Sequence, residues 1–144
     1  MKKQYRNLVN KYTKMTGSKF LLDTNIITAW LKGETAVADK IDKAKEIHIP
    51  VIVLGELYYG ALYSTQVDKN IREIKSICEN YNVLPVDDET AIAYGQIKAA
   101  LRKKGKPIPE NDIWIAALAK RYELIVVTRD KHFKEIESIK IKKW

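Results

Sequence analysis

Apolar residues fall along this chain in two patterns. Short, nearly continuous apolar runs predict buried strands at residues 19–22, 46–50, 82–86 and 124–128, with an edge strand within 138–144. Between these runs, apolar residues at helical spacing predict helices at residues 25–31, 36–45, 50–64, 68–80, 87–103 and 112–122. Strands that alternate with helices are typical of a parallel sheet covered on both faces. The pattern therefore predicts a three-layer α/β/α sandwich around a central, mostly parallel sheet of about five short strands.

The run from Leu124 to Thr128 is the clearest strand, because it is apolar, β-branched and bounded by polar residues. Such a run predicts a central strand that is covered on both faces. The alanine-rich helix before it carries Ala116 and Ala119 on the same face as Asp112. These small residues allow the helix to approach the sheet closely, which would draw Asp112 inward, but they are equally consistent with ordinary core packing.

The composition indicates one soluble domain. With 144 residues, of which 46% are hydrophobic and 31% charged, the chain is long enough to bury a proper core. The single cysteine, Cys78, excludes an intramolecular disulfide, and only two histidines, His48 and His132, argue against a histidine-rich metal site. No apolar run reaches the roughly 20 residues that span a bilayer, and the N-terminus lacks a signal-peptide core. We therefore expect a cytoplasmic protein that does not bind membranes, with His48 in a strand and Cys78 buried in a helix.

The net charge of +8 is unevenly distributed. Residues 1–18 contain five basic residues and no acid, whereas basic and acidic residues are nearly balanced in 19–144. This contrast separates a basic N-terminal arm or lead helix, 1–18, from a globular domain, 19–144. The arm is either a phosphate-binding segment or, as we favour, a solubilising helix or frayed tail.

Four acids are expected at or near the carboxyl edge of the sheet, where α/β proteins bind their ligands. Asp23 follows the first strand and Asp130 follows the strand at 124–128. Glu56 lies in the helix after the second strand, and Asp112 lies in the first turn of the alanine-rich helix. The three aspartates also suit local roles as a helix cap, a turn residue and a partner of the helix dipole. Glu56 is harder to explain locally, because its neighbours are apolar and a carboxylate among them is costly unless it is paired.

Four carboxylates in one place would repel one another and raise one another's pKa unless a cation balanced them. Hard divalent cations such as Mg²⁺ take oxygen ligands, keep several waters and bind substrate phosphates. Water on such a cation is a stronger acid than bulk water and becomes a nucleophile. The four acids therefore indicate metal-assisted hydrolysis of a phosphodiester.

Four motifs, LLDTN, GELYYG, PENDIWIAALA and VVTRDKHF, occur in an order and spacing that resembles the PIN domain. More narrowly, they resemble VapC-type toxins of bacterial and archaeal toxin–antitoxin pairs, and the likeness covers residues 19–144. The resemblance implies a ribonuclease that depends on Mg²⁺ or Mn²⁺ and cleaves within RNA. It also implies a homodimer, and a cognate antitoxin whose tail lies across the acidic groove.

The resemblance also assigns roles to individual residues. The catalytic acids that it implies are Asp23, Glu56, Asp112 and Asp130. The implied metal ligands are Asp23, Asp112 and Asp130, with Glu56 binding directly or through water. The polar residues implied to support them are Asn25 and Thr128. Thr24, between the first acid and the first of these helpers, receives no role.

Basic and aromatic residues near the acids are candidates for binding RNA. The basic candidates are Arg102, Lys103, Lys104 and Lys106 in the loop before Asp112, and Arg129 and Lys131 beside Asp130. A solvated basic loop is an equally good interpretation. The aromatic candidates for base stacking are Tyr58, Tyr59 and Trp114, although such residues are more often core or dimer contacts. We assign His132 to local structure or a peripheral contact.

Three other functions are compatible with parts of the sequence. The first is a PIN-fold nuclease in RNA processing outside a toxin–antitoxin pair. The second is a phosphoryl-transfer domain with Asp23 as nucleophile, but it would favour a second acid or a lysine where Asn25 and Thr128 stand. The third is a non-catalytic binding partner, which would be expected to lose at least one of the four acids.

Overall fold

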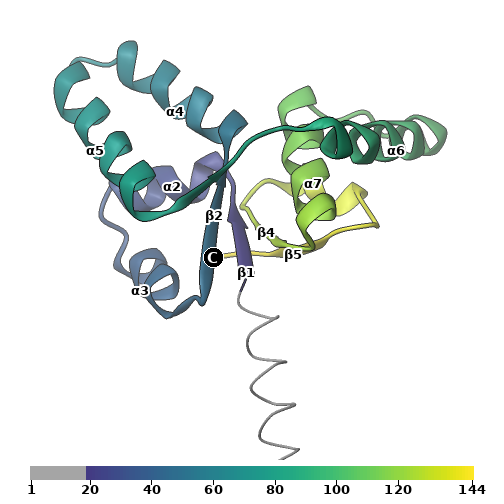
Figure 1. The fold of residues 1–144 in the computed structure, drawn as a ribbon, viewed down its shortest axis with the longest axis horizontal. Helices are drawn as coiled ribbons and strands as arrows, with labels where there is room; N and C mark the ends of the chain where they lie inside the picture. Colours follow the sequence, from purple (N-terminus) through teal and green to yellow (C-terminus); the bar gives the residue numbers. More distant parts are fainter. Residues whose placement is uncertain (1–18) are drawn as a thin grey trace, which may run out of the picture.

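The sheet is formed by five parallel strands in a computed structural model that describes residues 19–144 (Figure 1). The strands are β1 (Lys19–Leu22), β2 (Glu46–Pro50), β3 (Asn82–Leu84), β4 (Ile125–Val127) and β5 (Lys140–Lys142). Their order across the sheet is β3-β2-β1-β4-β5, and every neighbouring pair is parallel. The predicted parallel sheet of five short strands is confirmed, whereas the predicted basic arm, 1–18, lies outside the described residues.

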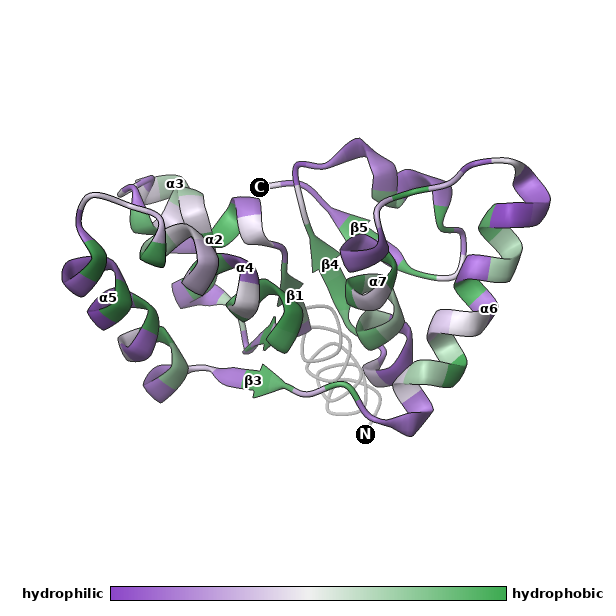
Figure 2. Ribbon diagram, turned by 90° about the horizontal axis from the view of Figure 1, so that it is seen from above, coloured by the Kyte–Doolittle hydropathy of each residue, from purple (hydrophilic) through white to green (hydrophobic). Residues whose placement is uncertain are grey.

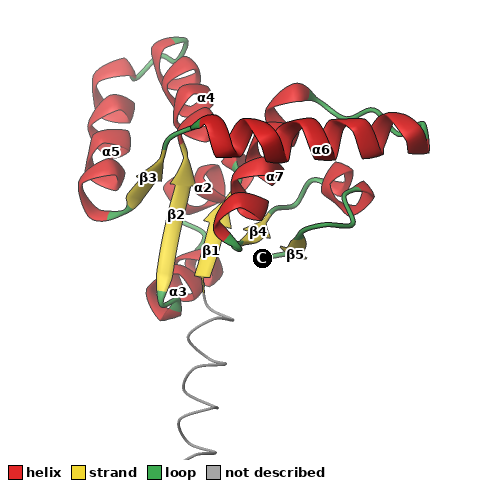
Figure 3. Cartoon of the chain, turned by 45° about the vertical axis from the view of Figure 1, so that its right-hand side comes forward, coloured by secondary structure: helices red, strands yellow, loops and turns green. Residues whose placement is uncertain are grey.

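Helices flank the sheet on both sides. They are α2 (Thr24–Leu31), α3 (Thr35–Lys43), α4 (Val51–Leu62), α5 (Val67–Asn80), α6 (Asp88–Lys104) and α7 (Glu110–Tyr122), followed by the short 3-10 helix η1 (Lys131–Glu135). In the view from above, α2 and α3 lie on one side of the strands and α6 and α7 on the other (Figure 2). The three-layer arrangement predicted from the alternating pattern is therefore confirmed (Figure 3).

Most boundaries differ from the predicted ones by one or two residues. Helix α7 begins at Glu110 rather than Asp112, since Pro109 sets the extended backbone before a helix. Helix α6 continues to Lys104, where Gly105 ends it in the left-handed conformation with φ 68°. The 3-10 turn η1 had no counterpart among the predicted elements.

The core is densest around β1 and β4. Leu21 and Leu22 of β1 and Val126 and Val127 of β4 are fully buried, as expected for strands covered on both faces. The middle strand is β1, however, and β4 lies beside it between β1 and β5. Hydrophobic residues accordingly dominate these two strands in Figure 2. Together they form a rigid support for the residues that follow them.

Two smaller expectations have different outcomes. His48 lies in β2, as predicted. Cys78 lies in α5 but is half-buried rather than buried, because α5 exposes one side to solvent. Within residues 19–144, no helix combines the length and the apolar character that a membrane crossing requires.

Candidate active site

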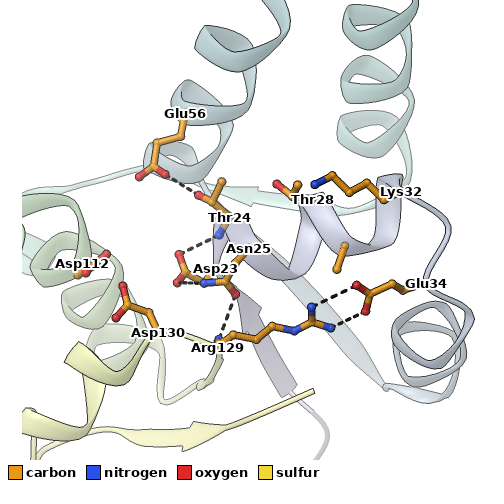
Figure 4. Close-up of a pocket in the computed structure, with 11 residues that line it drawn as sticks. Asp23, Thr24, Asn25, Thr28, Lys32, Glu34, Glu56, Asp112, Arg129 and Asp130 are labelled. Atoms are coloured by element: carbon orange, nitrogen blue, oxygen red, sulfur yellow. Dashed lines mark hydrogen bonds and ion pairs between the residues drawn. The ribbon is translucent and has the colours of Figure 1, made fainter. Parts of the chain in front are cut away.

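All four predicted acids line one open pocket of about 480 Å³ at the carboxyl edge of the sheet (Figure 4). They come from four separate places in the chain: the end of β1, the middle of α4, the first turn of α7 and the residue before η1. The other lining residues are Thr24, Asn25, Thr28, Ala29, Lys32, Glu34 and Arg129. The fold therefore brings together residues that are more than a hundred positions apart in the sequence.

Asp23 lies at the centre of this edge because of the strand register. Leu22 of β1 is opposite Val127 of β4, so the next residues, Asp23 and Thr128, leave the sheet side by side. The Asp23 N–H donates to the Val127 carbonyl (3.0 Å), which extends the pairing by one more bond. Asp23 also caps α2, since its Oδ1 accepts the Thr24 N–H (2.8 Å). Asp23 thus acts as a helix cap, as the sequence suggested, and it also lines the pocket.

Asn25 and Thr128 hold the Asp23 carboxylate. The Thr128 hydroxyl donates to Asp23 Oδ2 (2.7 Å) and accepts the Asp130 N–H (2.9 Å). The Asn25 amide donates to the same Asp23 oxygen (3.1 Å), and its carbonyl accepts the Arg129 N–H (3.1 Å). Both predicted supporting residues therefore contact Asp23, and they connect it to the backbone N–H groups of Arg129 and Asp130.

Glu56 is held by two residues that the sequence analysis did not single out. The Thr24 hydroxyl donates to Glu56 Oε2 (2.7 Å), and the Asn111 amide donates to Glu56 Oε1 (3.1 Å). Glu56 is half-buried on α4, so these bonds supply the pairing that a carboxylate among apolar neighbours needs. The sequence did contain a clue to both residues, because each is next to a candidate acid: Thr24 follows Asp23 and Asn111 precedes Asp112.

Asp112 and Asp130 approach each other beside His132. Asp130 caps η1 by accepting the His132 N–H (2.9 Å). The His132 Nδ1 lies 2.9 Å from Asp130 Oδ1 and 3.8 Å from Asp112 Oδ2. One ligand atom from each of the three lies within 4.8 Å of the others, and no such group in residues 19–144 includes Asp23 or Glu56. His132 thus lies beside two of the acids without lining the pocket, which agrees with its assignment to local structure or a peripheral contact.

Burial and mutual repulsion raise the pKa of two acids. Burial raises the pKa of Asp112 to about 7, and the charges of Asp23 and Asp130 contribute in the same direction. The pKa of Asp23 is raised mainly by burial, while the hydrogen bonds from Thr128 and Thr24 act in the opposite direction. Asp112 lies inward, and Ala116 and Ala119 on the same helix are buried in the core, which agrees with both interpretations of these alanines. The pocket therefore holds more negative charge than its own residues balance.

The basic candidates do not gather at the acids. Arg102, Lys103 and Lys104 lie in the last turn of α6 rather than in a loop, and neither they nor Lys106 lines the pocket. Lys104 pairs with Glu135 (3.5 Å) and Glu137 (3.4 Å) instead. The loop predicted for these residues is confirmed for Lys106 and wrong for the other three, because the helix ends only at Gly105.

Two other cations line the pocket. Arg129, a predicted candidate, binds Glu34 through two bonds (2.6 and 3.2 Å) and the Trp144 carbonyl through its Nε (2.9 Å). Lys32, at the end of α2, is exposed and has no salt bridge with any residue in 19–144. It was missed, although Asn25, Thr28 and Lys32 follow one another at helical spacing on one face of α2.

The aromatic candidates pair with other rings. Trp114 stacks on Tyr94 with ring centres 4.0 Å apart, and Tyr59 stacks on Tyr63 at 6.0 Å. Tyr58 is partly buried against the core. None of these rings lines the acidic pocket, so stacking on RNA bases stays a prediction.

The family model of the PIN domain matches residues 20–139, a range that includes all but the first residue of β1, the whole of α7 and all four acids. Together with the parallel sheet and the acidic pocket, this match defines the class of the protein. The chain belongs to the PIN-domain family, and within that family to the VapC proteins. The resemblance drawn from the four motifs is thereby confirmed.

The relatives support this assignment over nearly the whole chain. Ribonuclease VapC2 of Haemophilus influenzae is 33% identical over 129 residues, which is 88% of this chain and 98% of the relative. The tRNA(fMet)-specific endonuclease VapC of Salmonella typhimurium is 33% identical over the same length and coverage.

Solved structures of VapBC complexes support the same assignment. DNA-bound VapBC of Salmonella typhimurium contains a chain with 36% identity and a TM-score of 0.79, covering 88% of this chain and 98% of that one. VapBC-1 of nontypeable Haemophilus influenzae contains one with 30% identity and a TM-score of 0.80, covering 87% and 97%. The similarity therefore extends to the complete fold.

Proposed function

We propose that this protein is an endoribonuclease toxin that hydrolyses RNA phosphodiester bonds with the help of Mg²⁺ or Mn²⁺ and is neutralised by a cognate antitoxin. The observation that carries the proposal is the convergence of Asp23, Glu56, Asp112 and Asp130 on one pocket. The relatives support it, since they are named ribonucleases and tRNA endonucleases. The structural neighbours named VapBC support the toxin–antitoxin pairing.

The donor set fits a hard divalent cation. Asp112 is only 9% exposed, its pKa is raised to about 7 by burial and by neighbouring carboxylates, and it accepts no hydrogen bond from residues 19–144. Such a carboxylate is unfavourable at neutral pH without a cation. Asp23, Asp112 and Asp130 would hold the cation, with Glu56 binding directly or through water. Once bound, a divalent cation makes water more acidic and offsets the negative charge of a phosphate.

The remaining residues position these acids. Thr128 and Asn25 fix the orientation of Asp23, while Thr24 and Asn111 fix Glu56. These contacts fix the carboxylates of Asp23 and Glu56 before RNA binds, so less side-chain entropy is lost on binding. Lys32 and Arg129 also line the pocket, and we propose that they bind the RNA phosphates on either side of the cleaved bond.

The test of the chemistry is cleavage of a single-stranded RNA oligonucleotide by purified protein with Mg²⁺, Mn²⁺ or EDTA. We expect cleavage with either cation, none with EDTA, and a loss of at least about a hundredfold in Asp112→Asn. Asp68→Asn is the matched control, because Asp68 also lies in the first turn of a helix but does not line the pocket. Full activity in Asp112→Asn would contradict the assignment.

The test of the toxin role is induced expression in cells with and without the small protein encoded beside this chain. We expect growth arrest that the neighbour relieves and that Asp23→Asn abolishes. Mapping RNA ends after induction, wild type against Asp23→Asn, identifies the target RNA. A harmless wild type with normal cleavage in vitro would favour RNA processing outside a toxin–antitoxin pair.

A phosphoryl-transfer role for Asp23 is not supported. A phosphoryl-transfer site would be expected to have a second acid or a lysine where Asn25 and Thr128 stand, and both of these residues instead donate to the Asp23 carboxylate. Asp23 is also only 5% exposed. Homodimer formation remains part of the proposal, with light scattering of the purified protein as its measurement.

A further inference from the structure

One side chain outside the four acids is held at the same edge of the sheet. His132 is the second residue of η1, and its N–H donates to Asp130 Oδ1 (2.9 Å). The next residue, Phe133, is fully buried and anchors η1 to the core. The imidazole therefore extends from a fixed backbone position, while 54% of its side chain remains exposed to solvent.

The geometry around the imidazole is that of a ligand set. Its Nδ1 is 2.9 Å from Asp130 Oδ1 and 3.8 Å from Asp112 Oδ2. The three candidate ligand atoms all lie within 4.8 Å of one another, and no other group of this kind occurs between residues 19 and 144. Separations of this size suit atoms that surround one cation at metal–ligand distances of about 2.0–2.2 Å.

Asp112 adds an independent observation. It is 9% exposed and faces the pocket, yet no residue from 19 to 144 donates a hydrogen bond to its carboxylate. The only partner of that carboxylate in this range is His132, at 3.8 Å, which is too far for a hydrogen bond. The oxygens of the Asp112 carboxylate therefore face an open pocket, where they are available to a cation.

We propose that His132 is a nitrogen ligand of a divalent-cation position that it shares with Asp112 and Asp130, and that this ligand favours transition-metal cations such as Mn²⁺ over Mg²⁺. Imidazole is a softer donor than a carboxylate, and Mg²⁺ keeps oxygen ligands and water. The proposal deepens the proposed function, on which it rests, because it concerns the cation of the same site. The ligating atom is Nδ1, because it is the ring nitrogen that lies beside both carboxylates.

A second interpretation of the same contacts makes the opposite prediction. If His132 were a protonated imidazole that only offsets the charge of the acids, its removal would strengthen the binding of every divalent cation. If it is a ligand, its removal weakens Mn²⁺ binding and leaves Mg²⁺ binding nearly unchanged. The two interpretations therefore differ in the sign of the change.

The first experiment measures Mn²⁺ affinity from the EPR signal of free Mn²⁺, and Mg²⁺ affinity by competition. We expect His132→Ala to weaken Mn²⁺ binding at least about tenfold, since loss of even an outer partner of a ligand costs this much. His48→Ala is the matched control, because the chain's other histidine contacts Glu46 and Asn82 and none of the four acids. An equal change for both cations, or tighter Mn²⁺ binding, would overturn the proposal.

The second experiment identifies the ligand atom by spectroscopy. Pulsed EPR of the Mn²⁺-loaded wild type should show coupling to an imidazole nitrogen, and this coupling should disappear in His132→Ala but persist in His48→Ala. Bound Mn²⁺ without nitrogen coupling, in a protein that still cleaves RNA, would refute the ligand role and leave the proposed function intact. No binding of either cation would refute both.

Discussion

The Thr24 hydroxyl donates a 2.7 Å hydrogen bond to Glu56 Oε2, while the Thr24 N–H donates to Asp23 Oδ1 at 2.8 Å. One residue in the first turn of α2 thus fixes two of the four acids, which come from different elements. The backbone bond would be made by any residue at this position, but the hydroxyl bond requires threonine or serine. Asn111 holds the other oxygen of Glu56, at 3.1 Å.

Thr24→Val is expected to lower kcat for RNA cleavage about tenfold to a hundredfold, because an unheld Glu56 carboxylate samples unproductive orientations. KM should change little, since Thr24 does not carry charge toward the phosphates. Thr24→Ser restores the hydroxyl and should recover most of kcat. The measurement is steady-state cleavage of an RNA oligonucleotide with saturating Mg²⁺.

Thermal unfolding separates this positioning role from a structural one. Valine has the shape of threonine and Glu56 keeps its bond to Asn111, so we expect a stability loss of no more than about 1 kcal/mol. A Thr24→Val protein with normal kcat, or one whose kcat falls only because it unfolds, would show that Thr24 does not position Glu56.

Asp112→Asn is expected to stabilise the metal-free protein at neutral pH. The folded pKa of Asp112 is raised to about 7 from an ordinary 3.8, so the folded state binds the proton more tightly than the unfolded state. The stability that this proton contributes is fully present below the ordinary pKa and is lost as the pH rises toward 7. Asparagine carries no such charge, so its advantage should grow between about pH 4 and 7 and then level off, at no more than about 4 kcal/mol.

Urea unfolding in EDTA across this pH range measures the effect. Asp68→Asn, in the first turn of α5, is the control and should show no comparable growth. If the stability gain of Asp112→Asn stays constant with pH, the pKa of Asp112 is not raised in the folded state and the prediction is wrong.

The order of elements was predictable from sequence because apolar periodicity reports directly which residues are buried. The run around β4 predicted a strand covered on both faces and the run at β1 predicted a buried strand, and Leu21, Leu22, Val126 and Val127 are fully buried. Boundaries depended on local backbone chemistry instead, as where Gly105 ends α6. The 3-10 turn η1 depends on the cap by Asp130 and on Phe133, which is buried only once β4 and α7 are in place.

The acids of the site were predictable for a different reason. Residues just beyond the carboxyl ends of parallel strands meet at one edge, and this placed Asp23, directly after β1, and Asp130, three residues after β4. The orienting contacts were not predictable, because the bonds from Thr24 and Asn111 to Glu56 depend on how α4 packs against α2 and α7. The same holds for Lys104, whose partners Glu135 and Glu137 are distant in sequence.

Mg²⁺ is expected to stabilise the wild type more at pH 8 than at pH 5.5. Below about pH 7 the Asp112 carboxyl holds a proton, and a cation must displace that proton to bind. A cation that binds only the folded state adds about 2.7 kcal/mol of stability at a hundred times its dissociation constant. Thermal unfolding with and without Mg²⁺ at the two pH values measures this, and Asp112→Asn should lose most of the Mg²⁺ effect. Equal stabilisation at both pH values would argue against a cation on Asp112.

Lys32 and Lys103 allow a direct comparison of two places where RNA phosphates could bind. Lys32 lines the acidic pocket, whereas Lys103 lies in the last turn of α6 and lines a separate depression with Glu135 and Glu137. Lys32→Gln should therefore raise KM for RNA with little change in kcat, and should reduce the salt dependence of binding by about one phosphate contact. Lys103→Gln should have a smaller effect on KM if RNA follows the pocket edge.

The measurement is KM and kcat at several salt concentrations for both variants, with catalytically inactive Asp112→Asn as the background for equilibrium binding. A larger effect of Lys103→Gln would place the RNA along α6 and restore the original assignment of the basic cluster at residues 102–106. A larger effect of Lys32→Gln would instead orient the RNA across the C-terminal end of α2, toward Arg129 and its partner Glu34. In that orientation Glu34→Gln should tighten RNA binding, because it frees the Arg129 guanidinium for a phosphate.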